Sequence, residues 1–92
     1  MTYGVEYLRV VLHRDIPNLD VVIFDRVKNA IEEKIITSPE VFGKPLRESL
    51  RGYRSLRIGD YRIVYRIEIR SVLIVAIDHR KIVYRVAQMR VS

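Results

Sequence analysis

Residues 52–66 have the sequence Gly-Tyr-Arg-Ser-Leu-Arg-Ile-Gly-Asp-Tyr-Arg-Ile-Val-Tyr-Arg, a pattern that predicts a tight β-hairpin. Two runs rich in β-branched and aromatic residues flank Gly59-Asp60. Glycine at the first position of a two-residue loop is typical of a type II′ turn. This loop places Arg57 opposite Arg62 on the two arms of the hairpin.

The two faces of this hairpin differ in chemistry, because side chains alternate across a strand. One face carries apolar and aromatic residues, namely Leu56, Ile58, Tyr61 and Ile63. The other face carries Tyr53, Arg57, Arg62 and Arg66. Like charges directly opposite each other destabilise a sheet. The arginine face is therefore predicted to bind an anion.

Charge is distributed unevenly along the chain. The 92 residues are expected to form a single domain, 1–92, with a net charge of +6 and a pI near 10.0. Residues 1–43 hold five Lys/Arg and seven Asp/Glu, whereas residues 44–92 hold twelve and four. A basic half joined to a near-neutral half is typical of proteins that bind polyanions. The alternative is an ordinary solvated surface.

Composition argues against several classes of protein. The chain has no cysteine and only two histidines, so we expect no disulfide, no metal site and no small-molecule cofactor. No apolar run approaches the length of a membrane span of about 18 residues. The N-terminus lacks the basic-then-apolar pattern of a signal peptide. We expect a soluble cytoplasmic protein that does not interact with membranes.

The order of the predicted elements is strand, helix and then an antiparallel meander. A strand is predicted over 2–11 and a helix over about 19–37, which Ser38-Pro39 ends. The hairpin arms are followed by a buried strand over 72–77, and the tail over 81–92 suits either a helix or a strand. The expected fold is α+β, an antiparallel sheet of about four strands with N-terminal helices packed on one face.

The next strand extends the arginine row. If Arg70-Ser71 forms a two-residue loop, His79 faces Arg62, whereas a slip of one residue places His79 on the opposite face. Guanidinium groups bind phosphate bidentately and stabilise charge on a pentacoordinate phosphorus, and a histidine exchanges protons near neutral pH. The row therefore has the chemistry to process a phosphodiester. The alternative is a solvated strand face.

Several motifs resemble those of one toxin family. They are Gly-Lys-Pro-Leu at 43–46, Leu-Arg-Gly-Tyr at 50–53, the run at 56–65, His-Arg-Lys-Ile-Val-Tyr at 79–84 and, in the predicted helix, Ala-Ile-Glu-Glu-Lys at 30–34. Together these segments are similar to the RelE/ParE superfamily of toxin–antitoxin toxins, and most similar to its RelE branch. The resemblance covers nearly the whole chain.

The resemblance implies an endoribonuclease, an mRNA interferase that cleaves mRNA in the ribosomal A site and is neutralised by a cognate antitoxin. In that reaction the ribose 2′-hydroxyl attacks the adjacent phosphate. The resemblance implies catalytic roles for Arg57, Arg62, His79, Arg80 and Tyr84, with Tyr84 stacking on or orienting a base. It also implies that Arg54 lies near the scissile phosphate, and we predict nucleic-acid binding by Lys44, Arg54, Arg66 and Lys81. Strand parity points Arg54 toward the apolar face instead.

The general base is not assigned by the resemblance. Some relatives place a glutamate in the connector where this chain has Lys44. Three alternatives remain for the base: His79, Tyr84 or a cation-assisted 2′-hydroxyl. Two other functions also remain, a ParE-like inhibitor of DNA gyrase and an inactive basic interaction module.

Overall fold

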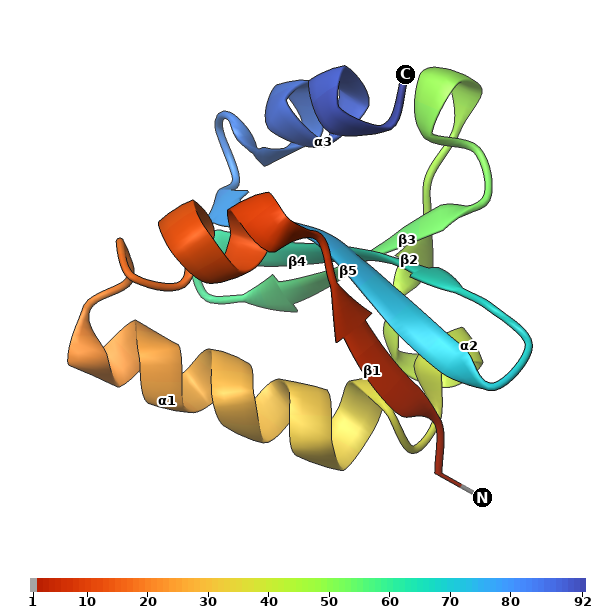
Figure 1. The fold of residues 1–92 in the computed structure, drawn as a ribbon, viewed down its shortest axis with the longest axis horizontal. Helices are drawn as coiled ribbons and strands as arrows, with labels where there is room; N and C mark the ends of the chain where they lie inside the picture. The colour runs from red at the N-terminus through yellow and green to blue at the C-terminus, as the bar shows by residue number, and fades with distance from the viewer. Residues whose placement is uncertain (1) are drawn as a thin grey trace.

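A five-stranded mixed sheet forms the centre of the molecule (Figure 1). The computed structural model describes residues 2–92. The strands lie in the order β1-β5-β4-β3-β2, with β1 parallel to β5 and the other neighbours antiparallel. The α+β prediction is confirmed. The prediction of about four antiparallel strands missed the parallel pairing of β1 and the two-residue β2.

The elements follow one another in a simple order. The strands are β1 (Gly4–Tyr7), β2 (Lys44–Pro45), β3 (Tyr53–Ile58), β4 (Tyr61–Ile67) and β5 (Ser71–His79). The helices are α1 (Val21–Ala30), α2 (Pro39–Phe42) and α3 (Val83–Val91). Two π-helical segments are η1 (Val11–Asp15) and η2 (Ile31–Ile35), which continues α1, and one 3₁₀ turn is η3 (Glu48–Leu50). Within residues 2–92, no helix has the length and apolar character needed to cross a membrane.

The β3–β4 hairpin has the predicted register. Arg57 faces Arg62 across the two strands. Gly59 has a φ of 58°, whereas Glu48 is the one non-glycine residue within residues 2–92 with a positive φ. Asp60 therefore has a negative φ, as the second position of a type II′ turn requires. The hairpin thus holds two guanidinium-bearing residues side by side.

The predicted register of β5 is wrong. Ile67 pairs with Val72, so the connection is longer than the expected Arg70-Ser71 loop. A bulge between Val64 and Tyr65 then shifts the ladder, and His79 faces Tyr61 instead of Arg62. Because a slip of one residue turns every side chain to the other face, His79 does not extend the arginine row.

Helices cover both faces of the sheet (Figure 1). The N-terminal helix α1 packs on one face, and its N-cap Asp20 accepts a hydrogen bond from the Ile23 amide at 2.9 Å. The C-terminal helix α3 packs on the other face through Val83 and Ala87. The tail is therefore a helix, and the predicted N-terminal strand ends at Tyr7 because a helical segment begins at residue 9.

Alkaline pH is expected to destabilise the fold through Tyr65. Burial raises the pKa of this phenol above its ordinary value of 10.0, and the hydroxyl donates to the Pro39 carbonyl at 2.6 Å. Above that value the unfolded chain ionises while the native one does not, so the free energy of unfolding falls by up to about 1.4 kcal/mol per pH unit. Urea denaturation between about pH 9 and about pH 11 measures this slope. The slope should be smaller in Tyr65→Phe, and an equal slope in both proteins would contradict the assignment.

Candidate nucleic-acid site

A polar cavity of about 420 Å³ opens on the α3 side of the sheet. Strands β2, β3 and β4 and helices α2 and α3 each contribute to it. It is lined by Phe42, Lys44, Leu46, Ser55, Leu56, Arg57, Arg62 and Tyr84. Four of these, Lys44, Arg57, Arg62 and Tyr84, are residues that the sequence predicted as functional. The remaining lining residues were not predicted.

Three cations meet at this cavity because the hairpin and β2 present them from adjacent strands. Lys44 pairs with Ser55, and Arg57 pairs with Arg62. Lys44 and Arg57 are exposed, whereas Arg62 is half-buried. The Arg62 Nη1 donates to the carbonyls of Gly59 and Tyr61, both at 2.9 Å. These bonds fix the Arg62 guanidinium beside the turn, while Arg57 extends into solvent.

Tyr84 forms the α3 side of the cavity. Its hydroxyl lies 3.1 Å from the Ser55 Oγ, and its side chain remains 37% exposed. Ser55 is buried and shares the strand face of Arg57, two residues away. From this alternation along the strand, the sequence could have predicted that Ser55 lies on the same face as Arg57 and lines the site. Phe42 ends the four-residue helix α2, and Leu46 follows β2; both lie in segments too short for a periodic pattern to place their side chains.

Three predicted residues, His79 at the end of β5 and Arg80 and Lys81 just after it, lie near the turn of the β3–β4 hairpin, outside the cavity lining. The Arg80 amide donates to the Asp60 carbonyl at 2.8 Å, and its Nε lies 3.9 Å from the Asp60 carboxylate. His79 contacts the Tyr61 ring edge-on and accepts a hydrogen bond at Nδ1 from the Lys81 amide at 3.2 Å. This bond favours the histidine tautomer with its proton on Nε2.

Two further predicted ligands are occupied by other parts of the protein. Arg54 points to the opposite face, as strand parity implies, and donates to the carbonyls of Glu40, at 2.9 Å, and Gly43. Arg66 pairs with Glu68 at 2.7 Å and lies over the Tyr53 ring. The hydrogen bond that Arg66 donates to the Glu68 carboxylate is the main cause of the raised Arg66 pKa. Neither guanidinium lines the cavity.

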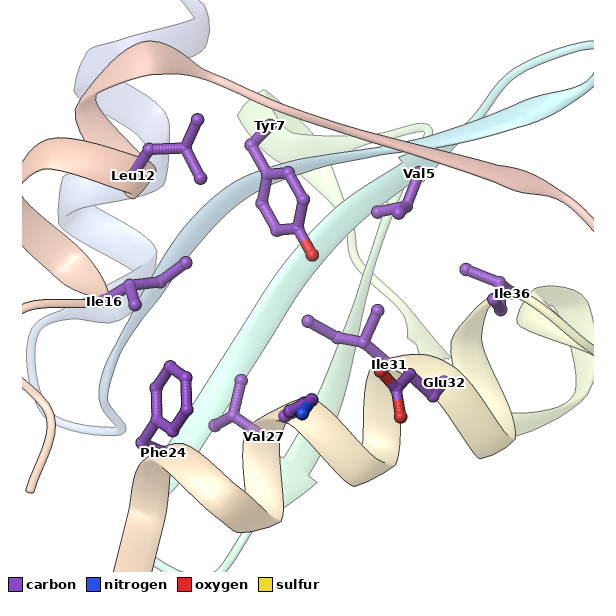
Figure 2. Close-up of a pocket in the computed structure, with 10 residues that line it drawn as sticks. Val5, Tyr7, Leu12, Ile16, Phe24, Val27, Ile31, Glu32 and Ile36 are labelled. Carbon is purple, nitrogen blue, oxygen red and sulfur yellow. The ribbon is translucent and has the colours of Figure 1, made fainter. Parts of the chain in front are cut away.

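A second cavity, of about 390 Å³, has a different chemistry (Figure 2). It lies between β1 and α1, and its apolar walls include Val5, Ile31 and Phe24. The Tyr7 hydroxyl points into it, and burial, followed by the nearby Glu32 carboxylate, raises the Tyr7 pKa. This cavity lacks the cluster of cations found on the other face, so it does not match a phosphate ligand.

The polar cavity can bind a phosphate and an attached flat group together. Guanidinium groups fork onto phosphate oxygens, the Lys44 ammonium adds a point charge, and the Tyr84 ring offers a stacking surface. Within residues 2–92, no three His, Cys, Asp or Glu side chains are grouped so that they could hold a metal ion. The cavity's charged groups are the three cations Lys44, Arg57 and Arg62.

Comparison with known proteins places the chain among toxins. Residues 11–84 match the model of a family described as the ParE toxin of the type II toxin–antitoxin system parDE. The chain is 51% identical over 45 residues to Toxin RelG of Mycobacterium tuberculosis, a match that covers 47% of this chain. The matched part spans 52%, about half, of the length of RelG.

Solved structures agree with this family. The toxin–antitoxin complex RelBE2 of Mycobacterium tuberculosis contains a chain 34% identical to this one, with a TM-score of 0.79 and coverage of 87% of this chain and 93% of that one. A mutant of E. coli toxin RelE in the free state has the same fold, with a TM-score of 0.79 at 19% identity over the full length of both chains. The protein belongs to the RelE/ParE superfamily of type II toxin–antitoxin toxins.

Proposed function

We propose that this toxin is a ribosome-dependent endoribonuclease that cleaves mRNA in the A site and so inhibits translation. The observation that carries the proposal is the convergence of Lys44, Arg57, Arg62 and Tyr84 on one open cavity. The RelE-type relatives and neighbours support it further. The site of action would be the cytoplasm, where messages are translated.

The proposed reaction needs charge stabilisation more than any other contribution. The 2′-oxygen attacks the adjacent phosphorus, the bond to the 5′-oxygen breaks, and a 2′,3′-cyclic phosphate and a 5′-hydroxyl result. The phosphorane gains negative charge in the transition state, and Arg57 and Arg62 would bind its equatorial oxygens. Lys44 would lie within reach of the same group and favour the ionised form of the attacking hydroxyl.

Proton transfer is assigned by position in the cavity. The 2′-hydroxyl loses a proton, and the leaving 5′-oxygen gains one. Of the two side chains proposed as general base, Tyr84 lines the cavity, whereas His79 lies at the end of β5, outside the lining, with its Nδ1 occupied. We assign Tyr84 to orienting the nucleobase of the substrate. The cations stabilise the 2′-alkoxide, and the proton of the 2′-hydroxyl passes to solvent water. His79, whose Nε2 carries the proton, is left as a donor at the edge of the site.

A cognate antitoxin is the proposed protein partner. The RelBE2 neighbour of Mycobacterium tuberculosis and the RelB-RelE neighbour of Methanococcus jannaschii were both solved as toxin–antitoxin complexes. We expect the antitoxin to lay a helix or a strand over the basic face, or to displace the C-terminal segment. Either arrangement would cover Tyr84 and the two arginines of the hairpin.

The decisive experiment is a cleavage assay on a ribosome-bound message, run in parallel with the same RNA free in solution. Purified protein should cut the message within the A-site codon, leaving a 5′-hydroxyl on the downstream fragment. Free RNA should be cut much more slowly. Intact message in the ribosome-bound reaction would refute the proposal.

Inhibition of DNA gyrase is the second candidate, because the matching family model is that of the ParE toxin. Poisoning gyrase requires no phosphate-cleaving group. A supercoiling and cleavage assay with purified gyrase separates the two activities. Gyrase-linked DNA breaks together with an intact ribosome-bound message would favour the ParE-like function.

Binding of single-stranded RNA should depend on salt through the cations of the cavity. The ligand is an uncleavable oligonucleotide that lacks the reactive 2′-hydroxyl. The logarithm of its association constant falls as the logarithm of the salt concentration rises, and each lost phosphate contact makes this slope less steep by about 0.7. Arg57→Ala should show this decrease. Arg70→Ala, which removes the same charge from an exposed loop, should keep the original slope. Fluorescence anisotropy across a salt series provides the measurement, and equal slopes in both variants would place the RNA elsewhere.

A further inference from the structure

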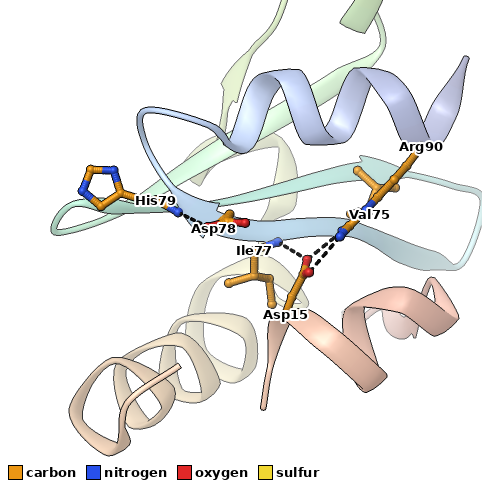
Figure 3. A network of polar contacts seen from close by, with 6 residues as sticks. All are labelled: Asp15, Val75, Ile77, Asp78, His79 and Arg90. Carbon is orange, nitrogen blue, oxygen red and sulfur yellow. Dashed lines mark hydrogen bonds and ion pairs between the residues drawn. The ribbon is translucent and has the colours of Figure 1, made fainter. Parts of the chain in front are cut away.

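A buried ion pair ties the C-terminal helix to the opposite end of the sequence (Figure 3). Arg90, in the last turn of α3, donates from Nη1 and Nη2 to the two carboxylate oxygens of Asp15 at 2.7 and 2.8 Å. The side chains are 12% and 2% exposed. Hydrogen bonding of the guanidinium to the Asp15 carboxylate is the main cause of the raised Arg90 pKa. Such a bidentate pair fixes direction as well as distance.

The same pair holds strand β5 at its bulge. Arg90 also donates to the Val75 carbonyl at 3.0 Å, and the Ile77 amide donates to the Asp15 carboxylate at 2.9 Å. Val75 is the residue of β5 that has no partner in the β4 ladder, since Ile74 and Ala76 pair with consecutive residues of β4. The pair therefore fixes η1, β5 and α3 at one point (Figure 3).

Helix α3 is thereby attached at both ends. Near its start the Tyr84 hydroxyl contacts the Ser55 Oγ at 3.1 Å, and near its end Arg90 contacts Asp15. Arg90 follows Tyr84 by six positions along the helix, which corresponds to a rise of about 9 Å. Because the helix is short and rigid, a change of tilt at Arg90 moves the Tyr84 ring at the cavity.

We propose that Asp15 and Arg90 are positioning residues that act on the cavity through Tyr84. The proposal rests on the proposed function, because its consequence is a faster cleavage step. Neither residue lines the cavity. Their effect is to hold Tyr84 at the place where the ring orients a bound nucleotide.

A double-mutant cycle between Arg90 and Tyr84 tests this coupling. Arg90→Met should lower kcat/KM for ribosome-bound message by about 10- to 100-fold, because a misplacement of about 1 Å in an active site costs up to about 100-fold. In a Tyr84→Ala background the same change should have little further effect. Equal losses in both backgrounds would show a merely structural role and overturn the proposal. All proteins are compared at a temperature where circular dichroism shows them folded.

Two more variants keep the test informative if Arg90→Met folds poorly. Arg90→Lys retains the charge and one bond to Asp15, so it should recover part of the lost activity. Asp15→Asn retains an acceptor for the Ile77 amide while it weakens the ion pair, and it should show the same coupling to Tyr84. No recovery by lysine together with additive losses for Asp15→Asn would refute the role.

A spectroscopic measurement separates this proposal from the proposed function. The ring resonance of Tyr84, assigned by its loss in Tyr84→Phe, should shift in Arg90→Met while that of Tyr3 stays in place. If wild-type protein leaves the message intact, the nuclease assignment fails, yet the shift still reports on positioning. An unchanged Tyr84 resonance overturns the positioning role whatever the cleavage assay shows.

Discussion

Alanine at Arg57 is expected to lower cleavage of ribosome-bound message by about 100- to 1,000-fold, the usual loss when one preorganised donor to a transition-state charge is removed. Arg57 is exposed, and its side chain lines the polar cavity. Its removal should therefore leave the free energy of unfolding within about 0.5 kcal/mol of wild type, as for most surface substitutions. Single-turnover kinetics and urea denaturation measure the two quantities.

Arg62→Ala should lose activity to a similar degree, but with an added cost in stability. The Arg62 Nη1 bonds to Gly59 and Tyr61 would vanish, and each such hydrogen bond contributes about 1 kcal/mol. Arg70→Ala serves as the charge-matched control and should cleave normally. Wild-type growth arrest by both the Arg57 and the Arg62 variant would exclude the cavity as the catalytic site.

Alanine at Gly43 is expected to be the most destabilising small substitution in the connector. A Cβ at this position would collide with the Tyr65 hydroxyl and would lie 2.7 Å from the Tyr65 Cζ. Tyr65 is fully buried and bonded to Pro39, so the ring cannot move aside. Overpacking of this kind costs about 1–3 kcal/mol. The φ of −84° at Gly43 suits any residue, so the cost is steric.

Two controls isolate the collision at Gly43. Gly4→Ala adds a methyl that meets the Arg70 carbonyl at 3.6 Å, an ordinary contact, so its stability should stay near wild type. In a Tyr65→Phe background the Gly43→Ala cost should shrink, because the nearest colliding atom is gone. Thermal and urea denaturation of the four proteins give the coupling. An unchanged Gly43→Ala cost in that background would contradict the proposed collision.

Local patterns predicted the hairpin well because its determinants are neighbours in sequence. The Gly59-Asp60 turn sets the register of its own arms, so the Arg57–Arg62 pairing follows directly. The orientation of Arg54 away from the arginine face also follows from parity alone. The predictions that rest on alternation within one strand pair were therefore the reliable ones.

The predictions that failed depend on distant residues. The bulge at Val75, which turns His79 to the face of Tyr61, coincides with contacts from Arg90 and Asp15 on other elements. The sequence around Val75 contains no turn residue that would mark the bulge, because the side chains that bond to the strand there come from other elements. The cavity wall formed by Phe42 and Leu46 was missed for a similar reason, since the four-residue α2 and the segment after it are too short to show a periodic pattern.

The parallel pairing of β1 with β5 has a kinetic consequence. Gly4 pairs with Ser71, so most of the chain lies between the two paired residues in sequence. The β3–β4 hairpin, in contrast, joins residues that are close in sequence. Pairings between residues far apart in sequence form slowly, because the entropy of closing the long loop is lost before the new contacts offset it. The strands that carry Lys44, Arg57 and Arg62 can therefore assemble before the N-terminal strand docks. We therefore expect β1 to be the last strand to dock and the first to open, while the three cations stay together.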